Sequence, residues 1–200
     1  METFILPLSN QSAVKQELSE FLSCVSQSSE NSVKMEIEFT NTNEGDPIKI
    51  LQLKISDILG NKKISISFSY QNLASNDFDF KCILDFDQGI KEVEEIFFKN
   101  SGPSDYEAVI QSNDVLNIKK LHCPGNWISF EGDVFVKECE WAPDNTISVS
   151  RFNQRWLEQI DVLKISPQLT DLRERIEKKT KSIKTHCVLE CLEGIVLVKL

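Results

Sequence analysis

A histidine and two cysteines lie close together near the C-terminus, in the sequence THCVLEC from Thr185 to Cys191. These residue types bind zinc and other soft metals, so a metal site is the first chemistry to consider. Structural zinc sites usually carry two pairs of closely spaced ligands, and no C-x-x-C pair occurs in this chain. The sequence therefore favours free thiols, and we predict no metal site and no cofactor.

The stretch from Thr185 to Cys191 can belong to a helix or to a strand. In a helix that runs from Ser166 to Glu193, both thiols continue a buried apolar stripe, where free cysteine commonly lies. In a strand from Thr185 to Leu192 that pairs with Ile195–Leu200, the thiols lie about 13 Å apart on one face, too far to share one zinc ion. The spacing of the apolar residues favours the helix, with Gly194 as its C-terminal cap.

Cys123 is the second candidate for chemistry, since a thiol beside a Pro-Gly turn could be an exposed nucleophile. The adjacent His122 would face the opposite way in an extended segment, so a histidine partner would have to be His186. The chain has only two histidines and lacks the glycine-rich phosphate loops, the G-x-S-x-G turn and the H-E-x-x-H motif. We expect a protein without catalytic residues, and the alternative is a small enzyme that uses Cys123 or a carboxylate pair.

Period-two alternation dominates the first hundred residues. An amphipathic helix is expected over Ser12–Val25, and a second helix over Gln88–Lys99. Between the helices we predict strands at Val33–Phe39, Ile48–Ser56, Lys62–Gln71 and Phe78–Asp87. Short loops between strands with one apolar face indicate an antiparallel β-meander of about four strands, backed by the helices.

The second half begins after the turn-forming sequence Ser101-Gly102-Pro103-Ser104. We expect this sequence to separate two lobes, residues 1–100 and 101–200, or to lie within one continuous domain. Strands are predicted at Tyr106–Gln111 and Val115–Leu121, followed by a β-hairpin of Trp127–Glu131 and Val134–Trp141 through Gly132-Asp133. A helix with Phe152, Trp156, Ile160 and Leu163 on one stripe precedes the last helix, and Ile195–Leu200 closes the fold. The predicted fold class is α+β with an antiparallel sheet.

The net charge is −9, and the first hundred residues hold 16 acidic and 9 basic side chains. On the predicted meander the acidic residues Glu36, Glu38, Asp77, Asp79 and Asp85 share the solvent face. Such a row can hold magnesium, but interspersed lysines favour a solvated surface. An anionic surface can steer and hold a basic partner. We therefore predict a non-catalytic protein-binding module, an adaptor, chaperone-like or inhibitory (immunity-type) protein, whose partner is a protein with a basic surface.

One stretch opposes this negative background. Six basic residues, Arg173, Arg175, Lys178, Lys179, Lys181 and Lys184, fall in twelve positions with only two acids. Such a strip can bind phosphates, which makes nucleic-acid contact the third interpretation, although the overall charge opposes it. Intrahelical ion pairs with Glu174 and Glu177 explain the same charges.

The N-terminal residues and the absence of long apolar runs indicate the cellular location of the protein. No apolar run approaches the roughly 20 residues of a membrane-spanning helix. Met1-Glu2-Thr3 also lacks the basic start of a secretory signal. We expect a cytoplasmic protein with free cysteines in a reducing compartment and no membrane contact.

Overall fold

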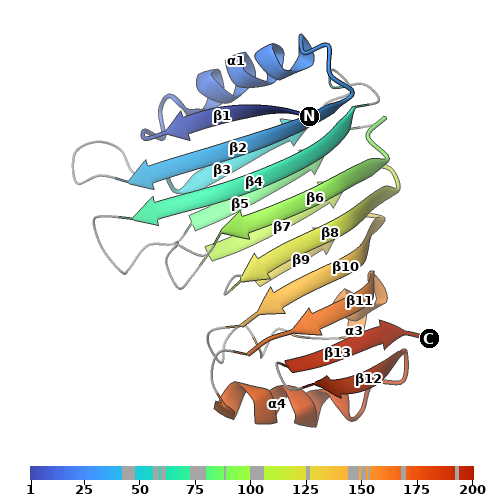
Figure 1. Ribbon diagram of the computed structural model, residues 1–200. Helices are drawn as coiled ribbons and strands as arrows, with labels where there is room; N and C mark the ends of the chain where they lie inside the picture. The colour runs from blue at the N-terminus through green and yellow to red at the C-terminus, as the bar shows by residue number, and fades with distance from the viewer. Residues whose placement is uncertain are drawn as a thin grey trace.

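The protein consists mostly of β-strands in two stacked sheets, with three short helices among the residues that the structure describes (Figure 1). The computed structural model describes residues 1–41, 48–55, 59, 62–72, 80–87, 89–99, 106–124, 127–143, 149, 152, 154–167, 170–191 and 194–200. The first sheet has nine strands, in the spatial order β1 (Glu2–Leu8), β2 (Ser32–Asn41), β4 (Lys63–Asn72), β6 (Glu92–Lys99), β8 (Leu116–Pro124), β10 (Val134–Ala142), β11 (Ile160–Ile165), β13 (Gly194–Lys199) and β12 (His186–Cys191). The second sheet has four strands, β3 (Ile50–Ile55), β5 (Phe80–Phe86), β7 (Tyr106–Ser112) and β9 (Trp127–Glu131). The helices are α1 (Val14–Ser26), α3 (Gln154–Glu158) and α4 (Thr170–Thr180).

From β2 to β10 the chain alternates between the two sheets, so that consecutive strands never pair with each other. Each strand pairs in parallel with the strand two elements later, as β2 does with β4 and β3 with β5. One strand from each sheet forms one coil, and successive coils stack along the molecule from α1 to α4 (Figure 1). The architecture is therefore a two-sheet parallel β-solenoid.

The core lies between the two sheets and is built from identical positions of successive coils. Val33, Met35 and Ile37 of β2 lie beside Ile64, Ile66 and Phe68 of β4, and all six side chains are buried. Ile66 in turn lies beside Ile96 of β6. Burial of each such side chain stabilises the fold by roughly 1.5–3 kcal/mol, and the branched residues suit a pleated surface. Apolar ladders therefore hold the coils in register.

Helices cover both ends of the stack. Helix α1 buries Val14, Leu18, Phe21 and Val25 at the N-terminal end, and its amphipathic spacing follows from the sequence. Helix α4 buries Leu172 and Ile176 at the other end. There β13 and β12 pair antiparallel and end the parallel stack. None of these helices is long and apolar enough to span a membrane.

The strict alternation of buried and exposed residues is interrupted at the same position in four neighbouring strands of the first sheet. In each, two successive residues that are not buried stand between two buried ones: Glu94–Glu95 in β6, Lys119–Lys120 in β8, Lys137–Glu138 in β10 and Asp161–Val162 in β11. These pairs depart from strict alternation as a β-bulge does, although each strand keeps a one-to-one register with its neighbour, and we call them bulges. The bulges stack because each strand keeps the register of its neighbour.

The predicted antiparallel meander and the α+β class are wrong. Period-two alternation located the strands, but short connections carry the chain into the other sheet instead of back along its neighbour. For the same reason β9 and β10 are not a hairpin, since β10 pairs with β8 and β11 and β9 pairs with β7. The two halves also share both sheets, because β5 pairs with β7 and β6 with β8.

Three helix predictions require correction. Within the helix expected over Gln88–Lys99, the residues Glu92–Lys99 form β6 instead, and the stripe from Phe152 to Leu163 divides into α3 and β11. The last helix ends at Thr180, and the residues after it form β12, which pairs with β13 as the alternative prediction stated. The helix expected over Ser12–Val25 is confirmed, within two residues, as α1.

Candidate functional site

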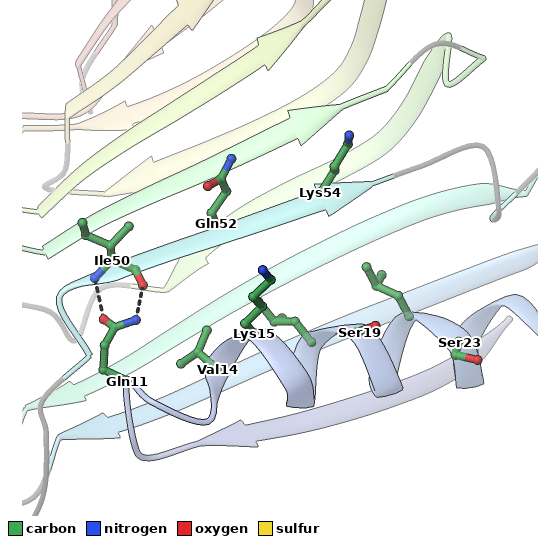
Figure 2. A pocket seen from close by; sticks show the side chains of 10 residues that line it. Gln11, Val14, Lys15, Ser19, Ser23, Ile50, Gln52 and Lys54 are labelled. Atoms are coloured by element: carbon green, nitrogen blue, oxygen red, sulfur yellow. Dashed lines mark hydrogen bonds between the residues drawn. The ribbon is translucent and has the colours of Figure 1, made fainter.

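A groove of about 840 Å³ lies between α1 and β3, at the N-terminal end of the stack (Figure 2). Its lining combines apolar, amide and hydroxyl side chains with two lysines: Gln11, Val14, Lys15, Leu18, Ser19, Leu22, Ser23, Ile50, Gln52 and Lys54. A volume of this size is typical of a ligand-binding cleft. The groove is therefore a candidate binding site.

The groove exists because the first coil is incomplete in the second sheet. The first sheet begins with β1, but the chain between β1 and β2 forms α1 instead of a strand beside β3. A helix with its side chains is about 10 Å wide, whereas sheet strands lie about 4.8 Å apart, so α1 cannot take the position of the missing strand. The edge of β3 is left beside the groove.

Gln11 occupies one position of this edge. Its side-chain Nε2 donates to the carbonyl oxygen of Ile50 at 3.0 Å, and its Oε1 accepts from the Ile50 amide at 2.9 Å (Figure 2). The amide of Lys49 donates to the same Oε1 at 2.8 Å. These are the bonds that the backbone of a neighbouring strand would make, so Gln11 stands in for a strand at one residue of β3.

The groove is locally positive in an acidic protein. Lys15 and Lys54 carry the only charges among the ten described residues that line it, and both are exposed. Lys54 also lies 3.2 Å from Asp87, but their side chains are 61% and 32% exposed, so this pair is weak. The groove therefore suits an anionic group in spite of the net charge of −9.

The predicted acidic surface is divided between the two sheets. Glu36 and Glu38 belong to β2 in the first sheet, whereas Asp85 belongs to β5 in the second. Asp77 and Asp79 lie outside the described residues. Lys34 lies 2.7 Å from Glu36, and their hydrogen bond lowers the pKa of this carboxyl group. The structure thus does not bring Glu36, Glu38 and Asp85 onto one surface, and their contact with a partner stays a prediction.

Near the bulges, the outer face of the first sheet carries a ladder of opposite charges. Lys119 Nζ donates to Glu94 Oε1 at 2.7 Å, and Lys164 Nζ donates to Glu138 Oε1 at 2.6 Å; each bond lowers the pKa of its carboxyl group. His122 lies between two carboxylates, 3.1 Å from Glu95 and 2.9 Å from Glu140. Both ring nitrogens are thus engaged across strands, which is a structural use of this histidine.

Cys123 is not placed for nucleophilic chemistry. Its side chain is buried, and its Sγ lies 3.7 Å from Sγ of Cys139. Burial, followed by the contact with Cys123, raises the pKa of Cys139 well above its ordinary value. Reactive cysteines instead have accessible sulfur atoms and lowered pKa values. The geometry therefore gives no support to the alternative in which Cys123 is catalytic.

The stretch from Thr185 to Cys191, considered above as a metal site, also has a structural explanation. His186 is buried, with Nε2 2.9 Å from the carbonyl oxygen of Ile160 and Nδ1 2.9 Å from Oγ1 of Thr185. Cys187 is exposed, and Cys191 follows four residues later in the extended strand β12. Within the described residues, no group of three or more His, Cys, Asp or Glu side chains could hold a metal ion.

Two members of the predicted basic strip make contacts within the protein. Arg173 Nε donates to Glu177 at 2.9 Å, and Lys179 Nζ donates to the carbonyl oxygens of Val149 and Phe152 at 2.9 and 3.3 Å. The other four, Arg175, Lys178, Lys181 and Lys184, are exposed. The strip therefore serves in part to attach α4 to the chain before it.

Sequence reasoning missed the groove, with Gln11 and Gln52 as its central residues. The free edge of β3 follows from strand order, which the local pattern does not encode. The one available signal was that a single helix separates the first two strands, so that the first coil lacks a strand in the second sheet.

By its architecture the chain is a parallel β-solenoid, closed by α1 at one end and by α4 with an antiparallel strand pair at the other. No protein family, curated protein or solved structure matches it.

Proposed function

We propose that the protein is a non-catalytic protein-binding module of the adaptor, chaperone-like or inhibitory type, which binds its partner at the groove between α1 and β3. The observation that supports this most directly is the lining of the groove. It joins the apolar Leu22 and Ile50 to the amide of Gln52 and to two lysines, and its ten described residues include no thiol, imidazole or carboxylate. Such a lining can bind a chain but offers no acid, base or strong nucleophile for catalysis other than a lysine.

The proposed function is of the class expected from the sequence, but the proposed binding surface is the groove instead of an acidic sheet face. The acidic side chains of the first sheet near the bulges are paired with lysines and a histidine, so the free anionic field on which the first expectation depended is reduced. The groove has the opposite sign, and the proposed partner accordingly presents an acidic segment instead of a basic surface. Free cysteines support a cytoplasmic, reducing location.

Site-specific photocrosslinking in the source cells tests the proposal. A photoreactive amino acid is placed at Ser19, which is exposed and lines the groove, and at Ser182, an exposed serine after α4 as the matched control. We expect a defined protein adduct at Ser19 that excess unmodified chain competes away, and none at Ser182. Equal adducts at both positions, or none at Ser19, would contradict the proposal.

A further inference from the structure

We propose that the partner of the groove is an extended acidic segment that adds a strand to the free edge of β3. This inference rests on the proposed function, because it names how the same groove binds and what chemistry it accepts. The parts of the structure that carry it are the backbone of β3, the position of Gln11 and the side chains on both walls.

The direction of the β3 backbone groups follows from the hydrogen bonds on its two sides. The carbonyl oxygens of Lys49 and Ile55 accept from the amides of Lys81 and Asp87, so the carbonyl groups of odd-numbered residues face β5. Ile50 instead bonds through both its amide and its carbonyl to Gln11. In a parallel ladder alternate residues point to opposite sides, so the amides and carbonyls of Gln52 and Lys54 also face away from β5, toward the groove.

These four backbone groups have no hydrogen-bond partner among the described residues. An unpaired row of this kind is a template for another strand, and folded proteins usually protect such edges. Here α1 stands back from the edge and Gln11 satisfies only its first position. An added strand would therefore pair with Gln52 and Lys54, beyond Gln11, and would supply the strand that the first coil lacks.

The walls of the groove determine the side chains of the added strand. Residues that point inward would meet Val14, Leu18 and Leu22 of α1, which favours apolar side chains. Residues that point outward would lie beside Gln52 and Lys54, where a carboxylate can pair across strands with the lysine. Lys15 adds a second positive charge on the opposite wall. The site thus fits a segment of alternating apolar and acidic residues.

Selection from a phage-displayed random octapeptide library on the full-length chain tests the inference. We expect the selected peptides to alternate apolar with acidic residues. Gln52→Pro removes the amide that faces the groove without affecting pairing to β5, and proline is tolerated at such edge positions. It should weaken peptide binding about tenfold, the effect of losing one hydrogen bond and its geometry, whereas Gln52→Ala, which keeps the backbone amide and removes only the side chain, should weaken binding less.

Charge and backbone protection provide independent measurements. Lys54→Glu should weaken binding of the same peptides at least fivefold, whereas Lys81→Glu, on the neighbouring strand β5 and outside the groove lining, should not. In the unsubstituted chain, a selected peptide should slow hydrogen exchange at the amides of Gln52 and Lys54. Hydrogen exchange tests strand addition at the edge of β3 in the unsubstituted chain, so the inference is tested even if Gln52→Pro fails to fold.

Three results would overturn the inference. The first is a library without enriched peptides, and the second is binding that ignores Gln52→Pro and leaves exchange at Gln52 and Lys54 unchanged. The third is a dimer by sedimentation that Gln52→Pro dissociates, since the occupant would then be a second copy of the chain. A groove crosslink at Ser19 without strand pairing would leave the binding function standing and reject only this mode of binding.

Discussion

Gly132 lies so close to Ser112 that a β-carbon at Gly132 would come within 2.1 Å of the Ser112 carbonyl oxygen. Ser112 ends β7, and Gly132 follows β9, the next strand of the same sheet. The two residues therefore form the same corner in successive coils, and the backbones meet there without room for a side chain. The φ angle of Gly132 is +84°, which glycine adopts with little cost.

Substitution of Gly132 by alanine should reduce stability by about 2–4 kcal/mol, because the unfavourable φ adds to a clash with backbone atoms. Gly89→Ala is the matched control. Gly89 also has a positive φ, +101°, and is exposed, so it should lose only about 1–2 kcal/mol. Urea unfolding of both variants provides the comparison. Equal losses would show that the approach of the two corners contributes nothing.

Trp141 should be a dominant residue of the C-terminal core. It is 2% exposed, stacks on Phe152 with ring centroids 5.8 Å apart and meets the edge of Trp156 at 5.5 Å. Trp141→Ala should cost about 3–5 kcal/mol in thermal or urea unfolding. Phe135→Ala in the same strand removes an aromatic ring that is 42% exposed, and it should change stability by no more than about 0.5 kcal/mol.

The five cysteines whose side chains the structure describes should divide into two classes in native thiol labelling followed by mass spectrometry. Cys24 and Cys187 are exposed and should react at the rate of ordinary thiols. Cys82, Cys123 and Cys139 are buried, and burial also raises the pKa of Cys139, so these thiols should react only after unfolding. Rapid native modification of Cys123 would restore the enzymatic alternative.

The ion pair of Glu138 and Lys164 should give a small pH-dependent contribution to stability. The hydrogen bond from Lys164 lowers the pKa of Glu138, so its contribution is present above the ordinary glutamate range and is lost as acid protonates the folded carboxylate. The same bond raises the pKa of Lys164, so the contribution is also lost when alkali deprotonates the folded amine. Both side chains are about one-third or more exposed, which limits the effect to about 0.5 kcal/mol.

A double-mutant cycle with Glu138→Gln and Lys164→Met checks this at several pH values. The coupling free energy should be greatest near neutral pH and should vanish in strong acid. A coupling that grows as the pH falls below the glutamate range would contradict the assignment of the pair.

The sequence predicts where most strands lie but not how they pair. Alternation such as Leu51, Leu53 and Ile55 reports which residues face a core, and it has the same form in a meander and in a coil. Strand partners depend on where each connection leads. A two-residue connection such as Gly132-Asp133 suggests a hairpin, yet here the chain turns a corner into the other sheet.

The bulges explain two of the helix errors. Glu94 and Glu95 both lie between the buried Val93 and Ile96, which changes a spacing of two into a spacing of three and resembles a helix. Ile160 and Leu163 in β11 are separated in the same way. The bulges are aligned through contacts between neighbouring strands, so the sequence of one strand alone does not reveal them.

The stacked corners of Ser112 and Gly132 also make the molecule modular in length. The twenty residues from Asn113 to Gly132 describe one complete circuit, so their removal would join Ser112 to Asp133 at an equivalent place and set β10 directly upon β6. Helix α1 would keep β1 and β3, and β11 would keep β10, whereas Trp156 of α3 would lose its stacking on Phe130 of β9. The corners thus mark where one circuit ends and the next begins, and the length of the stack follows from the number of circuits that the chain carries.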